Sequence, residues 1–245
     1  MYAVISDLHS NLAALEAVFA DIASCGVDEV LCLGDVVGYG PDPVPCLRLV
    51  REKVKLTLLG NHDEALMSEP FNFSAAAKAA IDWTRAQLPR DDPDMEELWA
   101  FLADLELMHQ RGPDLFVHGS PTDPTQDYLM PSDDLSSPKY DDVFEEFERL
   151  LFVGHTHLPC VITPDRKVRR AGALGNEYKL DADQAIVNVG SVGQPRDRDP
   201  RSCWVLVDDD RITWRRVPYD VQQTMDRILA AGLPAQLAER LMSGK

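Results

Sequence analysis

Five short apolar runs in the first two thirds of the chain each end directly in an aspartate, an asparagine or a histidine. Longer amphipathic stretches separate these runs, and the alternation predicts a mainly parallel sheet with helices packed on its faces. Because the carboxyl ends of parallel strands open onto one crevice, we expect the polar side chains after the runs to meet there. The side chains are Asp7 and His9, Asp35, the group Asn61, His62 and Asp63, then His118, and finally His155 and His157.

The amphipathic stretches are placed by the spacing of their apolar residues. A first helix that ends at Gly26 is predicted from apolar residues three or four positions apart at Leu12, Leu15, Phe19 and Ile22. A proline-led segment follows at 44–50 and a strand at 54–59. Similar patterns predict further helices at 74–88, 95–105 and 141–149.

After Val153 the pattern changes to short β-rich runs separated by turn residues, at 160–163, 168–171, 185–189, 202–207 and 211–217. Such runs predict antiparallel strands that form a second sheet packed on the first. Asp220 can cap a following helix, and a last short helix follows Pro234, so residues 220–245 are expected to form a helical tail. We find no repeat or linker in the sequence, which favours a single domain over residues 1–245.

The charge balance limits the partners of the chain. It holds 24 Lys and Arg against 41 Asp and Glu, a net −17, which is opposite in sign to what wrapping a nucleic acid requires. Residues 166–216 carry eleven basic and eight acidic residues, which leaves 13 basic and 33 acidic, a net −20, for the remainder. Binding of long nucleic acid is therefore disfavoured.

The sequence also bears on the compartment. No apolar run approaches the ~18 residues that a membrane helix requires, and no basic segment precedes Asp7 as in a signal peptide. Five scattered cysteines without a Cys-x-x-Cys pair favour a reducing compartment over disulfides or a thiolate zinc cluster. We expect a soluble, cytoplasmic protein, and the sequence leaves its oligomeric state open.

The residues after the five runs form a possible ligand set of two carboxylates, one amide and four imidazoles. This set suits Mn²⁺, Fe²⁺, Zn²⁺ or Ni²⁺ and suits Ca²⁺ poorly. Seven ligands are too many for one tetrahedral ion, and they suffice for two ions if a carboxylate bridges them. Each motif alone is also typical of a turn. Their conjunction favours a metal centre, because five of the six histidines lie in it and only His109, interpreted as structural, falls outside.

Taken in order, the motifs resemble those of the calcineurin-like metallophosphoesterase superfamily, and most closely its small bacterial phosphodiesterase-like branch. They are Asp7-x-His9, Gly34-Asp35, Gly60-Asn61-His62-Asp63, His118-Gly119 and Gly154-His155-Thr156-His157, together with the C-terminal motif at 188–196. The resemblance implies an α/β fold, a four-layer α-β-β-α sandwich of two packed mixed sheets with a short helical tail. It also implies a phosphoesterase whose two metal ions activate a water.

The resemblance further implies a role for each matching residue. Two divalent transition-metal ions, with manganese favoured, would share Asp35 and be completed by Asp7, His9 and His157 on the first ion and by Asn61, His118 and His155 on the second. His62 would donate a proton or stabilise charge on the leaving group, and Asp63 would orient its ring.

Two further positions are expected to contact substrate. The helix start near Ser10 and Asn11 is predicted to offer backbone N–H donors to a phosphate. Arg196 is the best side chain for a phosphate oxygen, although the adjacent Asp197 could equally neutralise it.

The sequence departs from the protein-phosphatase branch of the superfamily, which has Asp-Arg-Gly after the bridging aspartate and Gly-Asn-His-Glu at the next motif. Val37-Gly38-Tyr39-Gly40 and Gly60-Asn61-His62-Asp63 stand here instead. Protein phosphatase activity and diadenosine tetraphosphate hydrolysis are therefore disfavoured. The main hypothesis is hydrolysis of a small phosphodiester or phosphomonoester. The alternatives are a nuclease that uses the same site and a scaffold that keeps the fold without catalysis.

Overall fold

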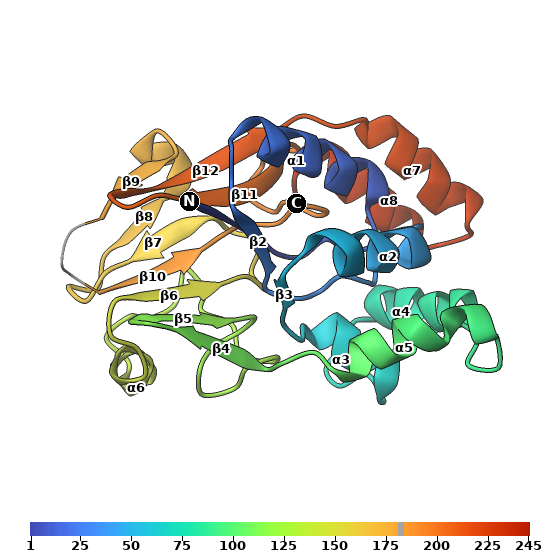
Figure 1. The fold of residues 1–245 in the computed structure, drawn as a ribbon, viewed down its shortest axis with the longest axis horizontal. Helices are drawn as coiled ribbons and strands as arrows, with labels where there is room; N and C mark the ends of the chain where they lie inside the picture. The colour runs from blue at the N-terminus through green and yellow to red at the C-terminus, as the bar shows by residue number, and fades with distance from the viewer. Residues whose placement is uncertain (181–183) are drawn as a thin grey trace.

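The computed structural model describes residues 1–180 and 184–245, and in it two six-stranded sheets lie face to face (Figure 1). The first sheet has the order β3 (Leu56–Thr57), β2 (Glu29–Cys32), β1 (Tyr2–Ile5), β11 (Ser202–Val207), β12 (Arg211–Val217) and β9 (Glu177–Lys179). The second has the order β4 (Met108–Arg111), β5 (Asp114–Val117), β6 (Leu150–Val153), β10 (Ala185–Asn188), β7 (Cys160–Ile162) and β8 (Val168–Arg170). Both sheets are mixed.

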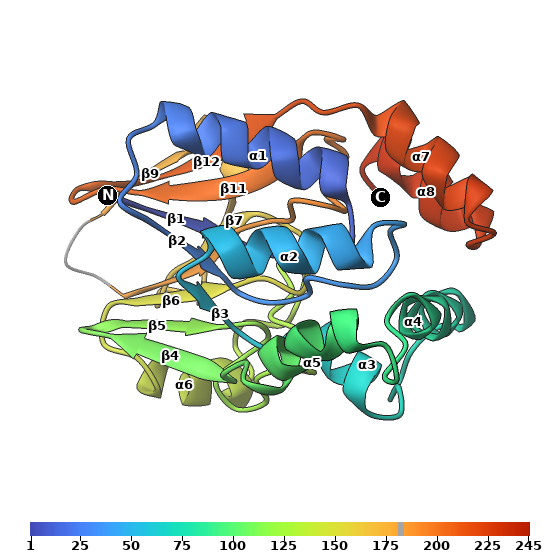
Figure 2. The ribbon, with the colours of Figure 1, turned by 45° about the vertical axis from the view of Figure 1, so that its right-hand side comes forward.

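Helices α1 and α2 cover the outer face of one sheet and α6 that of the other, whereas the remaining helices lie toward one end of the sandwich (Figures 1 and 2). Their bounds are α1 (Leu12–Ser24), α2 (Pro43–Lys53), α3 (Asn61–Met67), α4 (Ala75–Gln87), α5 (Glu96–Ala103), α6 (Pro138–Glu145), α7 (Val221–Ala230) and α8 (Ala235–Ser243). Short 3₁₀ turns lie at Pro93–Met95 and Ala171–Leu174.

The alternation of side chains along each strand produces the layers. In β1, Ala3 and Ile5 pack against α1 and α2, whereas Val4 points to the other sheet. In β6, Phe152 packs between the sheets, and Leu151 and Val153 pack with α6. The predicted four-layer α-β-β-α sandwich is thereby confirmed, and the predicted C-terminal helices are present.

The prediction that the later strands form a sheet of their own is wrong. β11 pairs antiparallel with β1, in the middle of the first sheet, and β10 pairs parallel with β6 in the second. β5 and β6, which precede His118 and His155 and were expected in the first sheet, belong to this second sheet. A local sequence pattern indicates that a strand is present, whereas the strand with which it pairs depends on packing between distant segments.

Several element boundaries also differ from their predictions. The strand predicted at 54–59 shrinks to β3, because α2 continues to Lys53 and the N–H of Val54 still donates to Val50. The helix predicted at 141–149 begins earlier, with Pro138 in its first turn. α3 was not among the predicted helices, and β4 and β9 are short edge strands with exposed residues and no apolar alternation to reveal them.

The C-terminal helices α7 and α8 pack against each other and against α4 through Ile228, Leu237 and Leu241. The carboxylate of Asp220 accepts from the N–H of Gln223 at 2.9 Å, which confirms the predicted cap. None of the helices in the described part of the chain has the length and hydropathy needed to cross a membrane.

Candidate metal centre

The loops that follow strands of both sheets meet at one end of the sandwich. The loops after β1 and β2 run side by side, because the N–H of His9 donates to the carbonyl of Asp35 at 2.9 Å. The loop after β6 joins them from the second sheet, where the N–H of His155 donates to a carboxylate oxygen of Asp7 at 3.1 Å. The seven predicted ligands are all buried at this junction.

The backbone of the junction is strained. It enters the left-handed region, which costs roughly 1–2 kcal/mol for each non-glycine residue, at Asp7 (φ 55°), His9 (φ 47°), Asp35 (φ 54°), His155 (φ 62°) and His157 (φ 60°). Gly154 permits a close approach of two loops, since a Cβ there would lie 2.6 Å from Oδ2 of Asp7. Such strain persists where the surrounding structure over-determines it, which is common at functional sites.

Asp7, His9 and His157 form a first cluster. Nε2 of His157 lies 3.2 Å from Nε2 of His9 and 3.0 Å from Oδ1 of Asp7. The other nitrogens of the two rings are engaged: Nδ1 of His9 faces the carbonyl of Val37 at 3.2 Å, and Nδ1 of His157 faces that of Gln194 at 2.6 Å. Because Nδ1 of each neutral ring donates to a carbonyl, each Nε2 presents a lone pair to the cluster.

Asn61, His118 and His155 form a second cluster with Asp35. Nε2 of His118 lies 3.1 Å from Nδ1 of His155 and 3.3 Å from Oδ1 of Asn61. Nδ1 of His118 donates to the carbonyl of Leu33 at 3.1 Å, which again directs Nε2 to the cluster.

Asp35 lies between the two clusters. Its Oδ2 is 3.6 Å from Nε2 of His9 and 3.5 Å from Nε2 of His118. Its Oδ1 accepts from the backbone N–H of His62 at 2.8 Å, which fixes the orientation of the carboxylate. The carboxylate therefore contacts both clusters at once.

These residues fit a pair of cations. In the neutral rings of His9 and His157, the Nε2 lone pairs point at each other from 3.2 Å and repel unless a cation lies between them. Oδ1 of Asp7 is buried and, among the described residues, has no hydrogen-bond donor. Three-membered groups of ligand atoms within 4.8 Å of one another occur on both sides, with Asp7, His9 and His157 on one side and Asp35, His118 and His155 on the other.

The charge state of each buried carboxylate and imidazole in the site depends on its burial and on the charges of its neighbours. Burial alone would raise the pKa of Asp35, but the neighbouring imidazoles, His118 first, hold it well below its usual range. Burial would likewise lower the pKa of His118, but Asp35 raises it to about 9. Burial lowers the pKa of His155 to about 3. The metal-free site at neutral pH thus holds one imidazolium, at His118, beside an ionised Asp35.

His62 lies beside the first cluster, with its ring centroid 4.8 Å from that of His9. One of its ring nitrogens also falls within 4.8 Å of ligand atoms of His9 and Asp35. Its Nδ1 is buried and makes no hydrogen bond to any described residue. Burial lowers the pKa of His62 to about 4, so the ring is neutral at neutral pH.

The predicted contact between Asp63 and the ring of His62 is not made. The carboxylate of Asp63 instead accepts from the backbone N–H groups of Val36, Val37 and Gly60, at 3.2, 3.1 and 3.3 Å. It thereby caps the start of α3 and ties it to the loop after β2. Burial, followed by the charge of Asp35, raises the pKa of Asp63 to about 7. Asp63 positions His62 only through the backbone of α3.

The prediction that the helix start at Asn11 binds substrate is wrong. Its amide oxygen accepts from Ala14 and Thr224, and its amide nitrogen donates to Gly193 and to the hydroxyl of Tyr219. The N–H groups of Ser10 and Asn11 donate to backbone carbonyls. Asn11 is thus a buried link between α1 and the helical tail.

Arg196 lies at the edge of the first cluster. Its neighbour Asp197 forms an ion pair with Arg216, so Asp197 does not neutralise Arg196. Nη2 of Arg196 donates to the amide oxygen of Gln194 at 2.8 Å. Burial and, next, the charge of Arg196 lower the pKa of His157. Within the described residues the guanidinium thus forms no ion pair, and its charge is felt at the first cluster.

Residues that the sequence analysis did not single out also line the site. The ring of Tyr39 lies 4.7 Å from that of His9 and 4.3 Å from that of His62, and the ring of Tyr128 stacks on His155 at 3.6 Å. No periodicity marks a loop aromatic as part of a site. His109 lies on β4, with Nδ1 3.3 Å from Oε2 of Glu106, away from the cluster.

Comparisons with known proteins extend this picture. A family model described as the calcineurin-like phosphoesterase superfamily domain matches residues 1–211. An uncharacterized protein of Methanocaldococcus jannaschii is 35% identical over 253 residues, covering 100% of this chain and 98% of the relative. The crystal structure of a metallophosphoesterase from Sphaerobacter thermophilus has a TM-score of 0.84 and 35% identity, covering 100% of this chain and 99% of that chain.

A shorter match is the symmetrical bis(5'-nucleosyl)-tetraphosphatase of Aromatoleum aromaticum, 33% identical over 103 residues, which is 40% of this chain and 37% of the relative. The full-length match to a solved metallophosphoesterase and the family model agree with the observed sandwich. The chain therefore belongs to the calcineurin-like phosphoesterase superfamily, as its motifs predicted. Residues 212–245, which include α7 and α8, lie beyond the family model.

The charge state of His118 predicts a proton release on metal binding. At pH 7.5 the metal-free ring is protonated, because its pKa is raised to about 9, and a bound ion must displace that proton. Asp7 and Asp35 are already ionised, since their pKa values are lowered, and contribute none. Calorimetric titration with Mn²⁺, without oxygen and in buffers of different ionisation enthalpy, should give a release of about one proton per chain from this ring.

The release should fall to less than half between pH 7.5 and pH 9.5, because a raised pKa keeps the proton only below about 9. An equal release at both pH values would contradict the assignment of the proton to His118.

Proposed function

We propose that this chain hydrolyses a small phosphodiester or phosphomonoester at two divalent transition-metal ions. One ion is assigned to Asp7, His9, Asp35 and His157, and the other to Asp35, Asn61, His118 and His155. The observation that carries this assignment is the single carboxylate of Asp35, which lies between the two clusters and within 3.6 Å of a histidine from each. Oxygen and nitrogen ligands suit Mn²⁺, Fe²⁺, Zn²⁺ or Ni²⁺, of which we favour Mn²⁺.

When bound, two such ions supply an activated water and neutralise charge on a phosphoryl group. The residues of the chain supply positioning and charge. Asp35 is held by the N–H of His62, and the ligand rings are fixed by carbonyls behind them. Phosphoryl transfer depends mainly on positioning and charge stabilisation, which is what such an arrangement provides.

The surroundings of the site favour a small substrate. A hollow of about 230 Å³ adjoins Asn61 and is lined in part by Phe71, Phe73 and Gln126. The net −17 of the chain repels a long polyanion at low salt. A nuclease that uses the same site is therefore the less favoured alternative, and a scaffold role is disfavoured because every ligand position of the motifs is filled. All five cysteines are free thiols, in keeping with our placement of the protein in the cytoplasm.

A panel of phosphoesters tests this function. With Mn²⁺, we expect hydrolysis of nitrophenyl phosphate, of bis-nitrophenyl phosphate, or of both, and a far lower rate per phosphate on long single-stranded DNA. The same assay after removal of metal with a chelator is the control, and should show no turnover until metal is restored. DNA cleavage at rates that match the small diester would favour the nuclease, and no turnover of any ester would favour the scaffold.

We further assign to His62 the stabilisation of the leaving group. Asn61 is the ligand-type residue at the start of α3, so the adjacent His62 points elsewhere. Its low pKa makes the ring neutral at neutral pH, so it acts by donating an N–H hydrogen bond to the leaving oxygen. The alternative is that His62 is a further metal ligand beside His9 and Asp35.

The substitution His62→Ala separates these roles. Loss of one preorganised hydrogen-bond donor to a developing negative charge costs typically ~10²–10³-fold, and the loss is largest when the departing oxygen carries the most charge. We therefore expect a loss of about 100-fold on alkyl esters and a much smaller loss on nitrophenyl esters, with unchanged metal content. Equal losses on both ester types, or loss of an ion from the variant, would assign His62 to metal binding instead.

A further inference from the structure

Two arginines lie together at the edge of the candidate metal centre. Both donate to the same acceptor, the amide oxygen of Gln194, Arg196 at 2.8 Å and Arg240 at 3.1 Å. Both guanidinium groups also lie over the ring of Tyr39, at 5.9 and 5.4 Å from its centroid. We call Arg196 and Arg240 the arginine pair.

Among the residues described, neither member of the arginine pair has a carboxylate partner, whereas the other arginines that are not exposed do. Of the seven arginines in the described residues that are not exposed, five lie within 4.0 Å of a carboxylate: Arg85, Arg149, Arg166, Arg215 and Arg216. Arg196 and Arg240 are the two without such a partner, in a chain with 41 acidic residues. Burial and, next, the charge of Arg196 lower the pKa of Arg240. Two unneutralised like charges repel, and an anion between them would relieve that repulsion.

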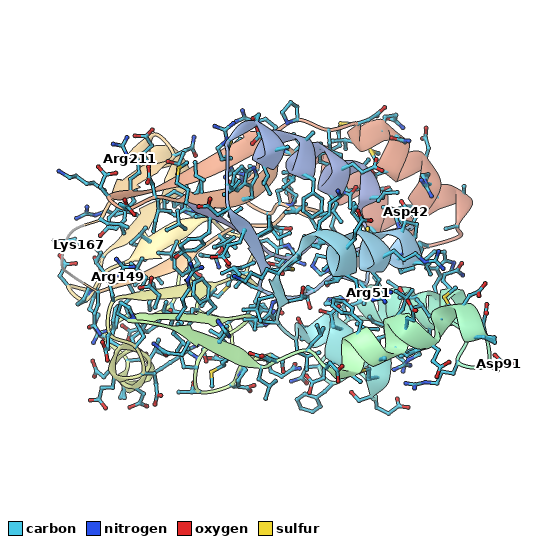
Figure 3. The ribbon with its side chains drawn as sticks, viewed as in Figure 1. Asp42, Arg51, Asp91, Arg149, Lys167 and Arg211 are labelled. Atoms are coloured by element: carbon cyan, nitrogen blue, oxygen red, sulfur yellow. The ribbon has the colours of Figure 1, made fainter. Side chains whose placement is uncertain are left out.

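The helical tail holds Arg240 firmly in place. α8 buries Leu237, Ala238 and Leu241 against neighbouring helices. Its end is joined to the loop of Arg196, because the N–H of Arg198 donates to the carbonyl of Gly244 at 2.8 Å. Arg227 of α7 forms an ion pair with Asp42, which Figure 3 marks at the start of α2. Residues beyond the family model thus deliver a charge to the site.

A single residue, Tyr39 on one route and Gln194 on another, separates the arginine pair from the assigned metal ligands. The ring of Tyr39, over which both guanidinium groups lie, also contacts the rings of His9 and His62, with ring centroids 4.7 and 4.3 Å apart. Gln194, which holds both arginines with its side chain, accepts with its carbonyl from Nδ1 of His157 at 2.6 Å. A ligand with anionic groups a few bonds apart can therefore reach both places.

We propose that the arginine pair binds a second anionic group, a carboxylate or a phosphate, on the same substrate whose phosphoester occupies the metal centre. The inference rests on the proposed function for the place of the phosphoester. Guanidinium groups suit both anions, since their planar array of donors matches carboxylate and phosphate oxygens. The substrate class is thus a small phosphoester with a further negative charge.

Binding of non-hydrolysable phosphonates tests the proposal without turnover. The probes are propylphosphonate, 3-phosphonopropanoate and propane-1,3-bisphosphonate, which share a spacer and differ in the group at its far end. Calorimetry with the Mn²⁺-loaded protein should show that at least one doubly anionic probe binds about 10-fold or more tightly than propylphosphonate. The tighter of the two identifies a carboxylate or a phosphate as the second group.

Arg240→Gln and Arg196→Gln should each abolish most of this preference, and Arg240→Lys should retain part of it. Arg198→Gln is the matched control, because it removes an exposed arginine two residues from Arg196, and it should keep the full preference. Thermal unfolding of each variant identifies any that is merely destabilised, and Arg240→Lys then carries the test.

Equal binding of all three probes to the unaltered protein, or a preference that survives both glutamine variants, would overturn the proposal. A preference that depends on the arginine pair in a protein without phosphoesterase activity would uphold the anion site and reject the proposed function. Turnover of phosphoesters without any such preference would uphold the proposed function and reject the anion site.

Discussion

The carboxylate of Asp35 joins parts of the molecule that are far apart in the sequence. Its Oδ2 faces His9, from the loop after β1 in the first sheet, and His118, from the loop after β5 in the second. Its Oδ1 accepts from the first turn of α3. A single buried anion thus lies at the contact between both sheets and a helix. The neighbouring imidazoles keep this carboxylate ionised despite burial, so the site retains the charge that a cation requires.

The sandwich makes this contact possible because the ends of strands from both sheets open at the same side. The energetic cost is carried by the loops, whose backbone is left-handed at Asp7, His9 and Asp35. Close approach requires glycine at particular points, and at Gly34 a Cβ would lie 2.4 Å from the backbone nitrogen of Gly60. Beyond the cluster, the helical tail adds Arg240 to an otherwise acidic molecule. Cationic groups therefore gather where an anionic substrate would bind.

The sequence predicts the strands and most helices because apolar periodicity is a local property. It also predicts that the seven candidate ligands between Asp7 and His157 lie together, because the ends of parallel strands share one edge of a sheet. It does not predict that β11 joins β1, since that pairing depends on packing between segments about 200 residues apart. Asp63 was assigned to the ring of His62, but nearby backbone N–H groups occupy its carboxylate. Asn11 contacts the helical tail and Arg240 belongs to it, and local sequence patterns do not predict where the tail packs.

The number of metal ions bound per chain tests the central claim most directly. Elemental analysis of protein equilibrated with saturating Mn²⁺ should give two ions per chain in the unaltered protein. In Asp35→Ala, which removes the carboxylate shared by the clusters, it should give fewer than two, with phosphoester hydrolysis abolished and the circular dichroism spectrum unchanged. At most one ion in the unaltered protein, or full metal content and activity in Asp35→Ala, would contradict the account.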